Sequence, residues 1–159
     1  MMNMKKIVLG AVALVSSLAL VACGSSDSAT KSDNWSTYES EKSITIGFDK
    51  TFVPMGFEQI DGSYTGFDID LANAVFEKYG ITVEWQPIDW DLKETELTNG
   101  NIDLIWNGYS ITDERKDKVL FTNPYMDNQQ VLVTKKSSNI SKVSDMKDKV
   151  LGAQAGSSG

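Results

Sequence analysis

Segments with strand-like and helix-like patterns alternate from residue 43 onward, and this alternation constrains the fold more than any other feature of the chain. Residues 43–48 alternate isoleucine with polar side chains, as a half-buried strand does. Residues 68–79 carry apolar side chains at helical spacing, with Asp68 as the predicted N-cap and Gly80 just past the helix. Strands that alternate with helices form βαβ units, so we predict an α/β fold with a mainly parallel sheet.

The remaining elements follow from the same patterns. The helix at 68–79 should bury an apolar stripe made of Ile69, Ala72, Phe76 and Tyr79. A hairpin turn is expected at Asp61-Gly62. Further strands are expected at 81–88, 102–106, 129–135 and 150–154. Short helices are expected at 92–97, capped by Asp89 or Asp91, and at 113–118 and 143–149.

Three loops should meet at one edge of this sheet, because they follow strands that we expect to be parallel neighbours. The loops carry Asp49, Phe52, Asp89, Trp90, Asn107, Gly108 and Ser110. An aromatic slot with a few convergent polar groups is the usual composition of a small-molecule site. Each residue also has a structural interpretation, since Phe52 and Trp90 could pack in the core and Asp49 could face water at a strand end.

Residues 102–126 join an apolar strand to the polar turn Asn107-Gly108 and then to Arg115. A guanidinium presents five donors in a planar fork that matches a carboxylate bidentately. This favours a small molecule that bears a carboxylate as the ligand. The alternative is that Arg115 pairs with one of the neighbouring acids on a solvated helical turn.

Residues 1–22 have the layout of a secretory signal peptide, with Lys5 and Lys6 ahead of an apolar run. The run is about 15 residues, short of the roughly 20 that a membrane span requires. It closes on Leu20-Val21-Ala22-Cys23, which resembles the bacterial lipobox. We therefore expect Cys23 to be lipidated (with palmitate among its acyl chains) and to anchor the protein on the extracytoplasmic face of the cell membrane. An ordinary signal peptide with an incidental cysteine is the alternative.

The composition argues against several other functions for this protein. The formal net charge is −7, and an acidic chain with scattered lysines argues against a nucleic-acid partner. The chain has no histidine and a single cysteine, which lies at the end of the leader, so triads that depend on histidine are excluded. The sequence also has no phosphate-loop motif and no metal-ligand cluster. We predict a protein that is not an enzyme and has no catalytic residue, cofactor or metal.

Three segments together resemble a known family: GFDKTFVPMGF, DGSYTGFDIDLANAVFEKYG, and the stretch from QPIDWDLKETELTNG to FTNPYM. They are similar to the amino-acid-binding lipoproteins of bacterial ABC importers, the family 3 solute-binding proteins. The resemblance implies a periplasmic-binding-protein-like clamp of two α/β lobes that close on an amino acid. It implies lobe one at 43–129, after a lipidated cysteine and flexible tether at 23–42. A hinge crossover and the start of a truncated lobe two would occupy 130–159.

The resemblance also implies roles for individual residues. Phe52 and Trp90 match the aromatic pair that sandwiches the ligand side chain, and Asp49 matches a position that often contacts its far end. Gly108 and Ser110 match the contacts to the ammonium and carboxylate groups, with Asn107 beside them at a variable position.

Two further positions concern the ligand carboxylate. Arg115 matches the arginine that clamps it. Ser157 and Ser158 lie in a turn similar to the family's carboxylate-binding turn at a helix N-terminus, where free backbone N–H groups attract anions. The sequence contains neither that helix nor the family's later ammonium-binding acid, so we expect this chain to be truncated and to bind weakly.

The implied function is the extracytoplasmic solute-binding component of an ABC importer, which delivers an amino acid to the permease subunits. A ligand-sensing input domain of an amino-acid receptor is the alternative. Asp49, Asp89 and Glu58 would favour a basic ligand by Coulomb attraction, although a neutral polar amino acid such as glutamine fits nearly as well.

Overall fold

The computed structural model describes residues 33–159. The predicted signal peptide at 1–22, the lipidation site at Cys23 and most of the predicted tether lie outside the described residues. The end of the tether range is helical, because α1 covers Trp35–Glu41. Within residues 33–159, no helix combines the length and the apolar character that crossing a bilayer requires.

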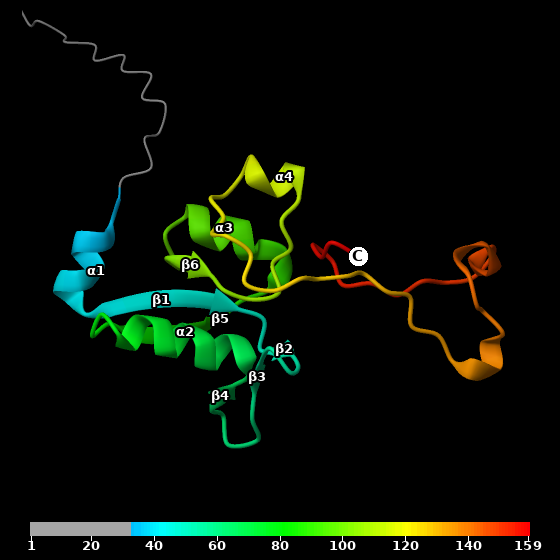
Figure 1. Ribbon diagram of the computed structural model, residues 1–159, viewed down its shortest axis with the longest axis horizontal. Helices are drawn as coiled ribbons and strands as arrows, with labels where there is room; N and C mark the ends of the chain where they lie inside the picture. The colour runs from blue at the N-terminus through cyan, green and yellow to red at the C-terminus, as the bar shows by residue number, and fades with distance from the viewer. Residues whose placement is uncertain (1–32) are drawn as a thin grey trace, which may run out of the picture. The chain divides into compact units, whose positions relative to one another are not determined.

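A parallel sheet of three strands forms the centre of the described part (Figure 1). Strand β1, Ser43–Phe48, lies between β5, Thr82–Pro87, and β6, Leu104–Ile105, and it runs parallel to both. Ile46 is in register with Trp85 on one side and with Leu104 on the other. The predicted α/β fold with a parallel sheet is thus confirmed, and the third strand is shorter than expected.

Helix α2, Phe67–Glu77, covers one face of this sheet and supplies part of the core. The buried core residues are Ile44, Ile46, Ala72, Phe76 and Ile81. The predicted stripe is therefore confirmed except for Tyr79, which is 54% exposed and packs edge-on against Trp35 of α1. Gly80 adopts a left-handed φ of 65° just after the helix, as predicted.

The predicted N-cap of α2 is wrong. The cap is Gly66, and Asp68 lies in the first helical turn with its side chain buried. The backbone N–H groups of Phe67 and Asp68 donate instead to the carbonyls of Pro54 and Met55, so no side-chain cap is needed. Only glycine fits at position 66, since its φ is 132° and a Cβ there would lie 2.3 Å from the carbonyl oxygen of Met55.

A small antiparallel sheet follows β1. It contains β2, Thr51–Phe52, β3, Gly56–Glu58, and β4, Tyr64–Thr65. The predicted turn at Asp61-Gly62 joins β3 to β4 and is confirmed, with Gly62 at a φ of 84°.

Short helices follow β5 and β6. Residues Trp90–Leu92 form a 3-10 turn, η1, which leads directly into α3, Lys93–Thr98. Of the two predicted caps, the structure shows Asp89, whose carboxylate accepts a hydrogen bond from the backbone N–H of Asp91. Helix α4 covers Asp113–Lys116 and is capped by the hydroxyl of Thr112.

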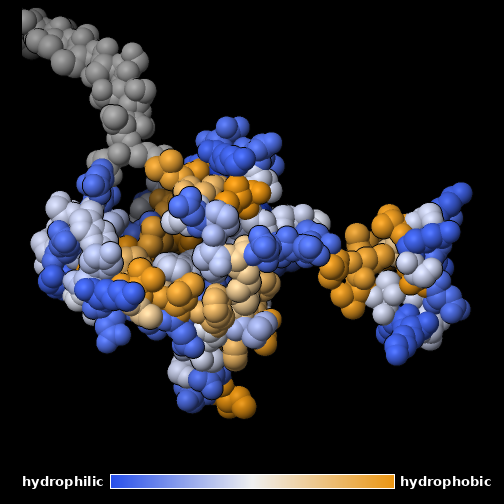
Figure 2. All heavy atoms as spheres, viewed as in Figure 1, coloured by the Kyte–Doolittle hydropathy of each residue, from blue (hydrophilic) through white to orange (hydrophobic). Residues whose placement is uncertain are grey.

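The strands predicted at 129–135 and 150–154 are wrong, because the structure has no strand in either segment (Figure 1). Between them lie only 3-10 turns, η2 at Lys136–Ser138 and η3 at Val143–Met146. A strand needs a neighbour for its backbone hydrogen bonds, and neither segment has one among the described residues. Their apolar side chains stay exposed, as Figure 2 shows, with Val133 at 86% and Val150 at 97%.

Candidate functional site

The three loops predicted to meet do so at the carboxyl edge of the parallel sheet. Their contacts form two groups. In one, the ring of Phe52 lies so close to Gly108 that a Cβ there would be 2.6 Å from Cε1 of the ring. In the other, Trp90 packs edge-on against Tyr109, with ring centroids 5.8 Å apart.

Phe52 and Trp90 therefore occupy different surroundings. Phe52 is 38% exposed, and its ring is open to a ligand. Trp90 is only 7% exposed, so a ligand could reach its ring only after neighbouring side chains move.

Arg115 is buried, and its guanidinium is held from three sides. Nη1 donates to the carbonyl of Ser110 at 2.9 Å, and Nη2 donates to the carbonyl of Gly156 at 2.8 Å. The guanidinium carbon lies 4.5 Å from the ring centroid of Tyr109, a cation–π distance.

The alternative interpretation of Arg115, pairing with nearby acids on a solvated turn, is wrong. Within residues 33–159 it takes part in no ion pair, and two of the neighbouring acids bind lysines instead. Lys116 binds Asp113 at 2.9 Å, and Lys118 binds Glu114 at 2.8 Å.

Lys93 is a site residue that the sequence interpretation missed. Its side chain is 3% exposed, and its Nζ donates to the carbonyl of Trp90 at 3.1 Å and to that of Gly156 at 3.0 Å. Burial lowers the pKa of Lys93, while the charge of Glu94 acts in the opposite direction. The available signal was its place three residues after Trp90, which puts both side chains on one helical face.

Tyr109 is a second residue that the sequence interpretation missed. It contacts the cations Lys93 and Arg115 with its ring and Glu94 with its hydroxyl. Its hydroxyl donates to Oε1 of Glu94 at 2.7 Å, and its ring stacks on Phe121 at 5.2 Å. Burial and the hydrogen bond to Glu94 raise the pKa of Tyr109, so it is a neutral donor at physiological pH. Oε2 of Glu94 accepts from Lys118 at 3.2 Å.

The predicted carboxylate-binding turn lies beside these cations. Gly156 has a left-handed φ of 67°, and its carbonyl faces Lys93 and Arg115. The hydroxyl of Ser158 donates to that of Ser110 at 3.3 Å and accepts from Gln130 at 2.7 Å. The structure thus brings Ser158 next to Ser110, and their contacts with a ligand carboxylate stay a prediction.

A cavity of about 570 Å³ adjoins this turn. It is lined by Asp91, Lys93, Glu94, Thr112, Glu114, Arg115, Lys118, Gly156, Ser157 and Ser158. Its volume lies within the usual range for a small-molecule pocket, but its lining is mainly charged. Of the predicted ligand-binding residues, only Arg115, Ser157 and Ser158 line it.

Asp49 and Asn107 are both buried at the sheet edge. Asp49 accepts hydrogen bonds from the backbone and hydroxyl of Thr51 and from Gln154 at 2.8 Å. Burial alone would raise the pKa of Asp49, but these hydrogen bonds outweigh it and hold the pKa below its ordinary value. Asp49 is therefore an anion. Oδ1 of Asn107 is buried and has no hydrogen-bond partner.

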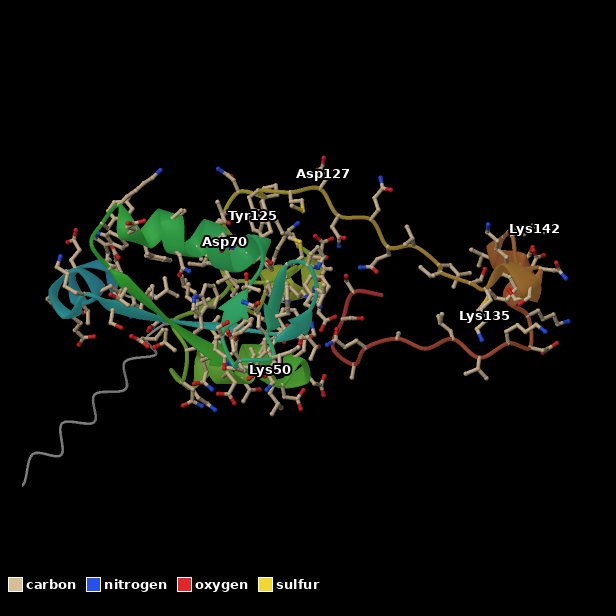
Figure 3. The ribbon with its side chains drawn as sticks, turned by 90° about the horizontal axis from the view of Figure 1, so that it is seen from below. Lys50, Asp70, Tyr125, Asp127, Lys135 and Lys142 are labelled. Atoms are coloured by element: carbon tan, nitrogen blue, oxygen red, sulfur yellow. The ribbon has the colours of Figure 1, made fainter. Side chains whose placement is uncertain are left out.

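A second polar cluster contains Asp68, Trp106 and Tyr125. Figure 3 shows Tyr125 near the start of α2, where its hydroxyl donates to Oδ1 of Asp68. Oδ2 of Asp68 and Nε1 of Trp106 are buried without a hydrogen-bond partner. Burial raises the pKa of Asp68.

The donor set of the described residues favours an organic anion over a metal ion. Within residues 33–159, no group of three or more His, Cys, Asp or Glu side chains could hold a metal. The site instead brings together the cations of Lys93 and Arg115, the hydroxyls of Ser110 and Ser158, and backbone carbonyls. Such a set can bind a carboxylate.

Comparisons with known proteins bear on the family and the fold of the chain. The sequence-family model for the bacterial extracellular solute-binding proteins, family 3, matches residues 44–154 of this chain. The chain is similar to an ABC uptake transporter substrate-binding protein from Streptococcus pneumoniae, solved with bound histidine. That match has 77% identity and a TM-score of 0.79, and it covers 82% of this chain and 53% of the other.

Two further matches are informative. A polar amino acid ABC uptake transporter substrate-binding protein from Streptococcus thermophilus is 72% identical, with a TM-score of 0.61, over 82% of this chain and 50% of the other. The arginine-binding extracellular protein ArtP of Bacillus subtilis is 35% identical over 97% of this chain and 57% of its own length. The chain thus spans about half the length of these relatives. The matches confirm the predicted periplasmic-binding-protein-like fold class.

Proposed function

Because the chain belongs to the bacterial extracellular solute-binding proteins of family 3, we propose that it acts as the extracytoplasmic solute-binding component of an ABC importer. In this role it binds an amino acid and delivers it to the permease subunits. Binding, rather than catalysis, is supported by relatives that are themselves named as binding proteins.

One observation carries the proposal: Arg115 is a buried cation with no acidic partner among residues 33–159. A buried charge is costly unless an opposite charge and hydrogen bonds compensate it. Its hydrogen-bond acceptors are two neutral carbonyls, and an aromatic ring lies at a cation–π distance from the guanidinium. An α-carboxylate would supply the missing charge, with the hydroxyls of Ser110 and Ser158 close by.

The proposed ligand is a polar or basic amino acid, with histidine as the first candidate. The histidine bound to the similar Streptococcus pneumoniae protein supports this choice. Phe52 would flank the ligand side chain, with Asp49 near its far end. The ring of Trp90 would join it only once the side chains that cover that ring have moved. Asp49 stays ionised, which favours a cationic side chain. Gly108 and Asn107 would contact the ligand from the third loop.

Location and architecture form a second part of the proposal. Residues 43–129 would make ligand-binding lobe one, and 130–159 the crossover and the start of lobe two. Lipidation at Cys23, after removal of 1–22, would hold the protein on the extracytoplasmic face of the membrane. The Leu20-Val21-Ala22-Cys23 motif supports the anchor.

A ligand screen tests the proposal. The full chain, isotopically labelled and purified in mild detergent, is titrated with each amino acid and followed by backbone amide NMR shifts, which detect millimolar binding. We expect L-histidine or another polar or basic amino acid to shift the amides around Gly108, Ser110 and Ser158 saturably. Alanine and leucine serve as controls of similar backbone chemistry. A chain that responds to no amino acid would contradict the proposed function.

A further inference from the structure

The carbonyl oxygen of Gly156 lies between two buried cations. Nζ of Lys93 is 3.0 Å away, and Nη2 of Arg115 is 2.8 Å away. A carbonyl is neutral, so neither cation is neutralised at this point. The carboxylate nearest to Lys93 is Oε1 of Glu94 at 3.9 Å, and that oxygen already accepts the hydroxyl of Tyr109.

Each cation also has a hydrogen bond that does not involve Gly156. The carbonyl of Trp90 fixes the ammonium of Lys93, which also lies 5.1 Å from the Trp90 ring centroid. The carbonyl of Ser110 fixes Arg115. The ring of Tyr109 faces both cations, at 5.7 Å from the ammonium and 4.5 Å from the guanidinium carbon. Such cation–π contacts stabilise two like charges that would otherwise repel each other.

We propose that Lys93 joins Arg115 in binding the α-carboxylate of the ligand, whose oxygen takes the place of the Gly156 carbonyl between the two cations. This inference rests on the proposed function and adds to it a second positive residue for the carboxylate. It specifies the ligand class as amino acids with a free carboxylate. Esters, amides and decarboxylated amines lack the anion that the pair of cations requires, so they bind poorly.

A structural role for Lys93 makes a different prediction. If the ammonium only ties Trp90 to the turn at Gly156, its loss disturbs the site for every ligand alike. If it contacts the carboxylate, its loss weakens only ligands that carry one. Comparing an acid with its ester therefore separates the two roles.

The test combines Lys93→Met with L-histidine and L-histidine methyl ester, in NMR titrations of the full chain. We expect Lys93→Met to weaken L-histidine binding at least about tenfold and to leave methyl ester binding within about threefold. Lys116→Met is the matched control, because this lysine follows Arg115 on α4 but does not line the cavity, and its side chain is 56% exposed. It should leave both affinities within about threefold.

The outcomes are distinct. Equal losses for acid and ester would overturn the role of Lys93 and leave the proposed function standing. Wild-type protein that binds no amino acid would overturn both.

A measurement on the wild-type chain covers the case in which Lys93→Met does not fold. The charged groups around Lys93 are Glu94, Arg115, Asp91 and Lys118. Because a bound carboxylate adds an anion to this set, saturating L-histidine should move the titration of the Lys93 Cε resonance to higher pH. The methyl ester should not. An unchanged titration with bound histidine would overturn the proposal.

Discussion

The hydroxyl of Tyr125 donates a hydrogen bond of 2.6 Å to Oδ1 of Asp68. The bond connects the segment after α4 to the first turn of α2. Asp68 is fully buried, and its second carboxylate oxygen has no hydrogen-bond partner. A buried carboxylate with one donor is only partly compensated for the loss of water.

Asp68→Asn should change how stability depends on pH. Burial raises the pKa of Asp68 in the folded state, so the folded protein binds more protons than the unfolded chain. The contribution of Asp68 to the free energy of unfolding is therefore largest below the unfolded pKa of about 3.9, and it falls as the pH rises toward the folded pKa. Asp68→Asn should lose this decline and still accept the Tyr125 hydroxyl.

Urea unfolding at a series of pH values from 4 upward checks this effect. Asp70→Asn is the matched control, because Asp70 lies on the same helical turn but is exposed. If both variants follow the wild-type pH dependence, Asp68 does not make the expected pH-dependent contribution to the free energy of unfolding.

Arg115→Ala should weaken the binding of L-histidine about 100-fold, since each hydrogen bond to a charged group is worth roughly 1.5–3 kcal/mol and ~1.4 kcal/mol is tenfold. Arg115→Lys should recover only part of the loss, because an ammonium cannot reproduce the planar fork. NMR or calorimetric titration measures both. Lys116→Ala removes an exposed neighbouring cation as the control. Affinity within about threefold of wild type for Arg115→Ala would return the residue to a structural role.

Gly108→Ala should reduce ligand affinity with little loss of stability. The new Cβ would lie 2.6 Å from Cε1 of Phe52, so the ring must move out of its position. Phe52 is partly exposed and can move without unfolding the core. The control is Gly152→Ala, where a Cβ meets no atom within 4 Å. Unchanged binding would show that the position of the Phe52 ring does not matter to the ligand.

Trp90→Ala should destabilise the ligand-free protein by roughly 3–5 kcal/mol, as expected for a buried tryptophan. Phe52→Ala should cost clearly less, because Phe52 is 38% exposed against 7% for Trp90. Thermal unfolding of the two variants gives the comparison. A Trp90→Ala protein as stable as wild type, with weakened binding, would mean that the ring mainly serves an open ligand slot.

Cys23→Ala should release the protein from membranes or leave an unprocessed precursor, because acyl chains provide the expected anchor. Fractionation of cells that express the full chain, followed by immunoblotting, measures this. Ser25→Ala tests the effect of a neighbouring substitution on processing. A Cys23→Ala protein that is processed and membrane-bound as before would rule out the lipid anchor.

The elements that could be predicted are those whose pattern is local. The polar–apolar alternation of β1 and the turn at Asp61-Gly62 depend on neighbouring residues, and both were correct. The N-cap of α2 could not be predicted, because Gly66 is required by a close approach to Met55 that only the tertiary fold creates. The strands expected at 129–135 and 150–154 failed because apolar alternation favours a strand only where a partner exists.

The same distinction holds for the site. The sequence predicted that the strands now labelled β1, β5 and β6 are parallel neighbours, although not their order, and this was enough to predict that the three loops meet. Lys93 was missed because its acceptor, Gly156, lies far away in the sequence, and its spacing from Trp90 does not by itself mark a lysine for burial. The burial of Trp90 was left open for a related reason, since it depends on Tyr109 from another loop.

The central position of β1 distinguishes residues that the fold requires from residues that can be substituted. This strand has hydrogen-bonded neighbours on both sides and supplies Ile44 and Ile46 to the core. Candidate ligand-contacting side chains lie beyond the ends of the strands, in loops that contribute less to that core. Substitutions at exposed loop positions such as Phe52 can accumulate over generations without loss of the fold, whereas buried Trp90 is more constrained. A few substitutions at the edge of one sheet could therefore change which ligand this fold binds.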